Sequence, residues 1–265
     1  MSAEPVRKLV IYTHLGLGDM IIMNGAVRYF ATQYAEVIVI CKRIYQEPVS
    51  MMYSDNPRIY LCVIEDDSEL HPWSLTKDLF QEQGYTVLGC GWFSGKENPA
   101  VYDIPHSFYD DLGIPRDYRL TYFSVPRSNE SIAIAKSFKV PYILVHEESS
   151  IVKIPITQRL REQGETRLLL DINKNIYPRD SPEWALAEQV VNIPLCNLAS
   201  VIENAEEVHM IESSIYALAL HLDLSRVKRK VVYTPEMDGL FTTTDTLNVF
   251  EAGPRLKPYE YRSKV

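Results

Sequence analysis

The chain has 265 residues, of which 46% are hydrophobic and 23% charged, and its net charge is −8 at pH 7. This composition predicts a globular protein and argues against a basic, duplex-binding surface. No window approaches the ~18 apolar residues of a membrane span. Met1 to Lys8 lack the apolar core of a secretion signal, so we expect a cytoplasmic protein that binds no nucleic acid.

Strands and helices alternate in the first part of the chain. The predicted strands are Leu9–Tyr12, Val37–Cys41, Ile59–Ile64 and Tyr85–Cys90, and the predicted helices are Asp19 to about Tyr34, Ile44–Met52 and Pro72–Gln83. This alternation predicts a parallel sheet with both faces covered.

The stretch from Gly91 to Arg127 is irregular, with short helical pieces such as His106–Leu112. It is also rich in aromatic residues, including Trp92, Phe93 and Phe108. Long irregular segments in compact proteins are usually functional loops or linkers. Two interpretations stay open: aromatic rings that stack on sugars, and a loop layer packed on the first domain.

Alternation resumes after this stretch. The predicted strands are Tyr142–His146, Arg167–Asp171, Val190–Ile193, Val208–Ile211 and, as the last one, Lys230–Tyr233; the predicted helices are Asn129–Phe138, Thr157–Gln163, Pro182–Gln189, Leu198–Asn204 and Ser213–Leu222. We therefore expect an α/β protein with two Rossmann-like domains, 1–128 and 129–250, facing a central cleft, and a tail, 251–265. Ligands bind such folds at the carboxyl ends of the strands.

The turn after the first strand contains Gly16, Gly18 and Asp19. Glycines let a ligand approach the backbone closely, and a helix start supplies free N–H groups. Asp19 occupies the position expected of a helix N-cap. Its negative charge opposes a bound phosphate, so Asp19 is either a plain cap or a working carboxylate.

Two later stretches combine a strand end with polar residues. After Val145, the chain reads His146-Glu147-Glu148-Ser149-Ser150-Ile151-Val152-Lys153, and after Ile211 it reads Glu212-Ser213-Ser214. Lys153 is suited to neutralise a phosphate and the serines to donate to one, and Ser213 or Ser214 is suited to cap a helix. A surface lysine and an ordinary capped helix are the alternatives.

In their order, these three stretches resemble the heptosyltransferase-like glycosyltransferases of the GT-B type. Members open with a strand, a small-residue turn ending in Gly-Asp and a helix; later they carry a Ser/Thr-rich loop with a Lys before a Pro, and an Asp-Ser-Gly type turn before an Ala- and Leu-rich helix. Here Glu212 replaces the usual Asp, Ser214 the usual Gly, and Ala217 a common His.

The resemblance implies an inverting transferase that moves a sugar from a nucleotide-diphospho-sugar to a glycan or glycoconjugate hydroxyl. Asp19 would be the general base. The donor would contact Gly16, Gly18, His146, Ser149, Ser150, Lys153, Glu212, Ser213 and Ser214. Neither a metal nor a cofactor besides the donor is expected, and the six histidines show no metal-ligand spacing.

Three other functions stay open. An NAD-dependent oxidoreductase fits Gly16 and Gly18, but Ile21 stands at the third glycine position and no acidic residue follows the second strand. A nucleotide-sugar epimerase would use His146 and the two glutamates after it. A non-catalytic module would bind a nucleotide-sugar without turnover.

Overall fold

The computed structural model describes residues 7–14, 16–65, 73–95, 104–150, 152–233 and 250–252. Within these residues the chain divides into two compact units between Pro126 and Arg127. Pro72 and the residues of the predicted tail from 253 onward lie outside the described residues.

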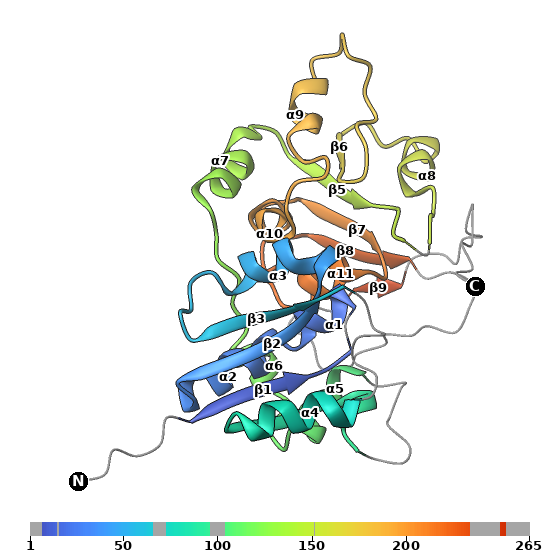
Figure 1. The fold of residues 1–265 in the computed structure, drawn as a ribbon. Helices are drawn as coiled ribbons and strands as arrows, with labels where there is room; N and C mark the ends of the chain where they lie inside the picture. The colour runs from blue at the N-terminus through green and yellow to red at the C-terminus, as the bar shows by residue number, and fades with distance from the viewer. Residues whose placement is uncertain are drawn as a thin grey trace. The chain divides into compact units, whose positions relative to one another are not determined.

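Unit 1 contains a four-stranded parallel sheet in the order β3-β2-β1-β4 (Figure 1). Its elements are β1 (Lys8–Tyr12), α1 (Leu17–Ile22), α2 (Asn24–Gln33), β2 (Glu36–Lys42), η1 (Arg43–Tyr45), α3 (Gln46–Tyr53), β3 (Ile59–Ile64), α4 (Trp73–Glu82), β4 (Tyr85–Gly89), η3 (Gly91–Phe93), α5 (Ile104–Asp111) and α6 (Tyr118–Thr121). The chain steps outward from β1 to β3 and then returns to the other side of β1 as β4. The topological switch point of the sheet therefore lies between β1 and β4.

Unit 2 contains a five-stranded parallel sheet in the order β6-β5-β7-β8-β9. Its elements are α7 (Asn129–Ser137), β5 (Tyr142–His146), α8 (Ile156–Glu162), β6 (Leu168–Asp171), α9 (Trp184–Glu188), α10 (Leu195–Glu203), β7 (Glu207–Ile211), α11 (Ser214–Ala219), β8 (Arg229–Tyr233) and β9 (Glu251–Ala252). The switch point of this sheet lies between β5 and β7, because β6 and β7 flank β5 on opposite sides.

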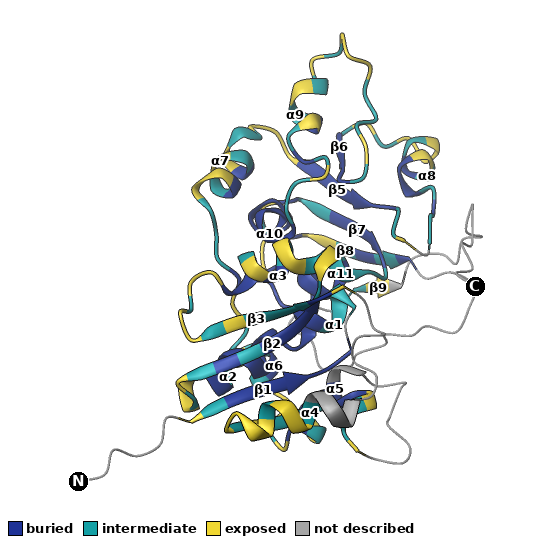
Figure 2. Ribbon diagram, in the orientation of Figure 1, coloured by how far each residue is buried: buried dark blue, intermediate teal, exposed yellow. Residues whose placement is uncertain are grey.

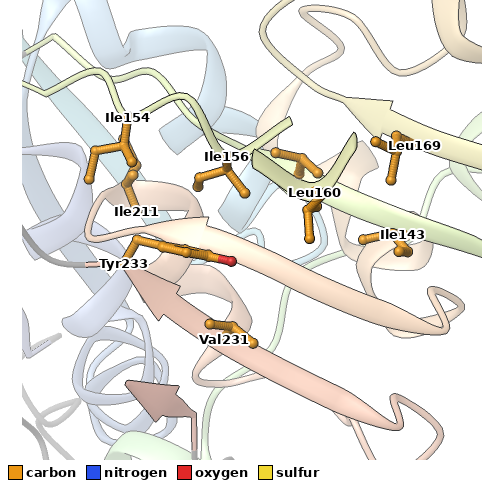
Figure 3. Close-up of a cluster of buried hydrophobic side chains, with 9 residues drawn as sticks. Ile143, Ile154, Ile156, Leu160, Leu169, Ile211, Val231 and Tyr233 are labelled. Atoms are coloured by element: carbon orange, nitrogen blue, oxygen red, sulfur yellow. The ribbon is translucent and has the colours of Figure 1, made fainter. Parts of the chain in front are cut away.

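The central strands are apolar because helices and loops cover them. β5 is buried along its whole length, and Figure 2 shows the same for most of β1 and β7. In unit 2, side chains from the sheet, from α8 and from the loop before α8 form one hydrophobic cluster (Figure 3): Ile143, Val145, Ile154, Ile156, Leu160, Leu169, Ile211, Val231 and Tyr233. Ile154 and Ile156 anchor that loop on the sheet.

The predicted α/β class with parallel sheets is confirmed, but two strand predictions are wrong. Val190–Ile193 forms a turn, in which Asn192 has φ 54° and donates its N–H to the Ile172 carbonyl. This apolar stretch is short because it ends at Pro194, the N-cap of α10. β8 is not the last strand, since β9 pairs with it in parallel at Val231.

The predicted helix from Asp19 to about Tyr34 is interrupted at Met23, giving α1 and α2. The cause is the Tyr109 hydroxyl, which accepts from the Ala26 N–H at 3.1 Å and donates to the Ile22 carbonyl at 2.9 Å. In a continuous α-helix these two backbone groups bond each other. Tyr109 is thus inserted into the helical ladder, a known cause of helix breaks.

Candidate functional site

The first candidate site is the loop between β1 and α1, at the switch point of unit 1. The N-cap of α1 is Gly16, so the prediction that Asp19 is the N-cap is wrong. Asp19 lies in the first turn, and its carboxylate accepts the Gly16 N–H. A Cβ at Gly16 would lie 2.6 Å from Asp19 Oδ2, so the glycine makes room for the carboxylate. This is the acidic half of a capping box.

Burial raises the pKa of the Asp19 carboxyl to about 6, although the Gly16 N–H and the positive charge of Lys42 act in the opposite direction. Asp19 is partly accessible, whereas the three residues after it are buried. A carboxylate with this pKa is ionised at neutral pH and is basic enough to accept a proton. Gly18, the second of the two predicted glycines, lies in the same first turn of α1 as Asp19.

Trp92, from the aromatic-rich stretch that the sequence singled out, contacts His14 of this loop. His14 is buried, and its Nε2 accepts the Trp92 N–H at 3.0 Å. Its neutral ring therefore carries the proton on Nδ1, and burial lowers the His14 pKa. The Trp92 ring stacks on His14 with centroids 4.2 Å apart. The sequence did not pair Trp92 with His14. The signal for this pair was position, because His14 comes shortly after β1 and Trp92 shortly after β4, which are neighbouring strands.

The second candidate site is the loop after β5 in unit 2. It folds back on itself: Glu148 bridges Lys153, and the Ile154 N–H donates to the Glu147 carbonyl at 2.8 Å. Lys153 Nζ lies 2.5 Å from Glu148 Oε2, so its charge is already paired. Ser149 closes the turn by accepting the Val152 N–H, and Ser150 is exposed.

A pocket of about 490 Å³ opens beside this loop. It is lined by Glu147, Lys153, Pro155, Thr157, Gln158, Lys174 and Ile176. The buried Glu147 carboxylate accepts from the Thr157 N–H at 2.9 Å and from Lys174 Nζ at 2.6 Å. Asp171, buried beside Glu147, has a raised pKa because of burial and the neighbouring negative charge. Both lysines of the lining are thus paired with carboxylates: Lys174 with Glu147 of the lining, and Lys153 with Glu148 of the adjoining loop.

Asn173 fastens the loop after β5 and was missed as a site residue. Its Oδ1 accepts the N–H groups of Glu147 at 3.1 Å and Glu148 at 3.0 Å, and its Nδ2 donates to the Glu148 carbonyl. Oδ1 also lies 3.1 Å from Nδ1 of His146. The signal was its place after β6, because the carboxyl ends of parallel neighbours meet at one edge.

His146, predicted to contact the donor, is buried, and burial lowers its pKa to about 4. It is therefore neutral at pH 7. Its ring contacts Asn173, and it is not among the described residues that line the pocket. His146 therefore helps to hold Asn173, which in turn fixes the loop after β5.

We expect Asn173→Ala to lower the free energy of unfolding by about 2–4 kcal/mol, because it leaves loop N–H groups without their acceptor. Urea unfolding measures this change. Asn204→Ala is the matched control, since the Asn204 side chain donates one hydrogen bond, to the Ser200 carbonyl. Equal losses in both variants would contradict a special role of Asn173.

The corner after β7 lies next to the loop after β5, because β7 pairs with β5 up to His146 and Met210. Ser213 caps α11, as predicted for one of the two serines: its Oγ accepts the Tyr216 N–H at 3.3 Å. Burial, with a smaller contribution from the charge of Glu212, raises the pKa of Tyr216 to about 12. Glu212, Ser213 and Ser214 are partly accessible and are not among the described residues that line the pocket.

Each predicted group of site residues therefore lies at the carboxyl edge of a parallel sheet. Gly16, Gly18 and Asp19 lie together in unit 1. In unit 2, the loop after β5 and the corner after β7 leave adjacent strands. Within the described residues, no group of three or more His, Cys, Asp or Glu side chains is placed to hold a metal ion.

Comparisons with known proteins place this fold among glycosyltransferases. No protein-family model matches the chain, and a search of curated proteins finds no match. A bacterial iron-containing dodecameric glycosyltransferase, TibC from enterotoxigenic E. coli H10407, matches in structure with a TM-score of 0.51 and 14% identity, over 86% of this chain and 58% of that one.

A glycosyl transferase of family 9 from Veillonella parvula also has a TM-score of 0.51, at 12% identity, over 90% of this chain and 84% of that one. E. coli ADP-heptose lps heptosyltransferase II matches with a TM-score of 0.48 and 13% identity, over 89% of this chain and 87% of that one. This chain thus spans under two thirds of TibC. At the level of the fold, the resemblance predicted from the sequence is confirmed.

No helix within the described residues is long and apolar enough to cross a membrane.

Proposed function

We propose that this protein is a glycosyltransferase that moves a sugar from a nucleotide-diphospho-sugar to a hydroxyl of a glycan or glycoconjugate. The observation that carries the proposal is Asp19, a partly accessible carboxylate with a pKa near 6 at the switch point of a parallel sheet. Ligands of open α/β sheets bind at such points. The likeness in fold to two glycosyltransferases agrees with it.

In the proposed reaction, the Asp19 carboxylate accepts the proton of the acceptor hydroxyl. The hydroxyl oxygen forms a bond to the anomeric carbon while the bond from that carbon to the diphosphate oxygen breaks. The nucleoside diphosphate leaves with the electron pair. Attack from the side opposite the leaving group inverts the anomeric centre, and Gly16 and Gly18 allow close approach to the backbone.

We assign the donor to unit 2. Lys153 would exchange its ion pair with Glu148 for the leaving diphosphate, and the hydroxyls of Ser149 and Ser150 would donate to it. The corner from Glu212 to Ser214 would provide further contacts on the same sheet edge. His146 and Asn173 would position this loop rather than touch the donor.

The proposal includes the GT-B arrangement, in which one domain holds the acceptor and the other the donor across a cleft. It also includes metal independence: the lysine and the backbone N–H groups offset the diphosphate charge. Metal independence predicts that transfer survives treatment with EDTA. Loss of transfer in EDTA that added metal restores would contradict this part.

The direct test is a panel of UDP-, GDP- and ADP-sugars and NAD(H), read by thermal shift and by release of nucleoside diphosphate. A ligand at 100 times its Kd adds about 2.7 kcal/mol of stability. We expect a nucleotide-sugar to stabilise the protein and Lys153→Ala to remove most of that gain. Lys136→Ala, which changes an exposed lysine on α7, is the control. Stabilisation by NAD(H) alone would favour an oxidoreductase, and stabilisation without transfer or hydrolysis a binding module.

The pH dependence follows from the Asp19 pKa. A general base must be ionised, so kcat/KM should be constant above pH 7 and fall about tenfold per unit below pH 6. Initial rates between pH 4.5 and 8 measure this profile. Lys42 lowers the pKa of Asp19, so Lys42→Ala should move the acidic limb of the pH–rate profile to higher pH. A limb near pH 4 would show that another group titrates.

A further inference from the structure

Trp92 is an exposed indole held in a fixed position. The residue is 65% exposed, yet one face of its ring lies on the His14 ring, with centroids 4.2 Å apart and planes tilted by 34°. Its backbone N–H also donates to His14 Nε2. His14 is fixed in turn by Phe108, which meets it edge-on at 5.1 Å. The second face of the indole is therefore open to a ligand and needs little ordering on binding.

Gly91 makes this support possible. Its φ is +60°, and a Cβ there would lie 2.4 Å from His14 Nε2 and 2.9 Å from Phe108 Cε1. The Gly91 N–H donates to Asp111 Oδ2 at 2.9 Å, and this hydrogen bond fixes the turn that follows β4. Only glycine allows the backbone to bring Trp92 onto the buried histidine at this point.

The indole also lies at the sheet edge that carries Asp19. Trp92 follows β4 and His14 follows β1, and the switch point lies between these strands. The negative charges of Asp19 and Asp111 both act on the Cys90 thiol, whose pKa burial raises to about 12. Cys90 directly precedes Gly91, so the carboxylate and the indole belong to one end of the sheet.

We infer that Trp92 is the stacking platform for a pyranose ring of the acceptor, whose hydroxyl Asp19 deprotonates. This inference rests on the proposed function. A pyranose has one face of C–H groups and an edge of hydroxyls, which matches an open aromatic face beside a carboxylate. Aromatic walls with a few polar groups are typical of small-molecule sites. A nucleobase also stacks on indole, and the test separates the two.

Binding is tested without any donor, by saturation-transfer NMR on the whole protein. The probes are the methyl glycosides of β-galactose, β-glucose and α-mannose, with erythritol as the acyclic polyol control and AMP and UMP as nucleobase probes. We expect saturation of the C–H protons of at least one glycoside. Trp92→Ala should weaken its Kd about tenfold, a change of about 1.4 kcal/mol, and Trp92→Phe should restore part of the affinity.

Tyr60→Ala is the matched control, because Tyr60 is another exposed aromatic residue of unit 1, 53% exposed on β3. It should leave glycoside binding unchanged. The inference is overturned if no glycoside shows saturation that depends on Trp92, or if only AMP and UMP depend on it.

The stacking role of Trp92 and the transferase reaction can be refuted independently of each other. Glycoside binding through Trp92 with no transfer from any donor would refute the reaction and keep the platform. Transfer with an acceptor KM unchanged in Trp92→Ala would refute the platform and keep the reaction.

Discussion

Replacing Asp19 by Asn should lower the rate of sugar transfer by about 10²–10⁴-fold while the donor Kd stays unchanged. Asn keeps the size of the side chain and an oxygen that can accept the Gly16 N–H. It lacks the basic carboxylate that takes the proton from the acceptor hydroxyl. Single-turnover rates and donor titrations separate the two quantities.

The same substitution should make the protein more stable. The pKa of Asp19 is higher in the folded protein than in the unfolded chain, so ionisation of Asp19 disfavours folding. This cost begins as the pH rises above the pKa of the unfolded chain and is complete above about pH 6. A neutral Asn removes it, which we expect to add about 1–2 kcal/mol at pH 7. Urea unfolding at pH 7 measures this gain.

Asp78→Asn provides the control for Asp19, because Asp78 is exposed on α4. It should change neither the transfer rate nor the unfolding free energy by a measurable amount. Full transfer activity in Asp19→Asn would exclude Asp19 as the base. Lower stability in Asp19→Asn would instead indicate that the capping role of the carboxylate outweighs the cost of burying it.

Tyr109→Phe should lower the free energy of unfolding by about 2–4 kcal/mol, because it leaves the Ala26 N–H and the Ile22 carbonyl without their shared partner. Both groups are deep in unit 1, where the Tyr109 side chain is fully buried. Urea denaturation measures the loss. The transfer rate should fall as well, because α1 carries Asp19.

For this loss of stability, Tyr60→Phe is the matched control, since it removes a hydroxyl from a half-exposed ring. Its effect should stay within about 0.5 kcal/mol. If Tyr109→Phe were equally mild, Ala26 and Ile22 would have to bond each other directly. Such a closure would join α1 to α2, and the helical circular dichroism signal would rise.

Hydrophobic pattern was enough to place most of the fold. The apolar runs Ile59–Ile64 and Tyr142–His146 coincide with β3 and β5. β5 is buried along its whole length, as a continuous apolar run predicts for a parallel strand, whereas β3 is an edge strand in which only Ile64 is buried. The pattern failed where tertiary contacts decide. Val190–Ile193 is equally apolar, but its N–H groups serve a turn before α10. The break at Met23 depends on Tyr109, 86 residues further along the chain.

For the candidate site, the sequence could predict which strand ends carry polar residues but not how these residues pair. Asp19, Lys153 and Ser213 follow the predicted strand ends, although Asp19 lies in the first turn of α1 and not at its N-cap. The ion pair of Lys153 with Glu148 depends on how the loop after β5 folds back on itself. The hydrogen bonds from this loop to Asn173 join two segments that are far apart in the sequence, which no local pattern encodes. Their part in binding a donor stays a prediction.

The exclusively parallel pairing within the described sheets has a consequence for how the chain acquires its structure. Lys8 of β1 must find both Glu36 and Tyr85, and no strand pair can zip up from a tight hairpin. Chains dominated by such non-local contacts refold in milliseconds to seconds rather than microseconds, and those of this size commonly populate intermediates. During synthesis, β1 therefore waits for the residues of β4 to emerge before its second edge is covered.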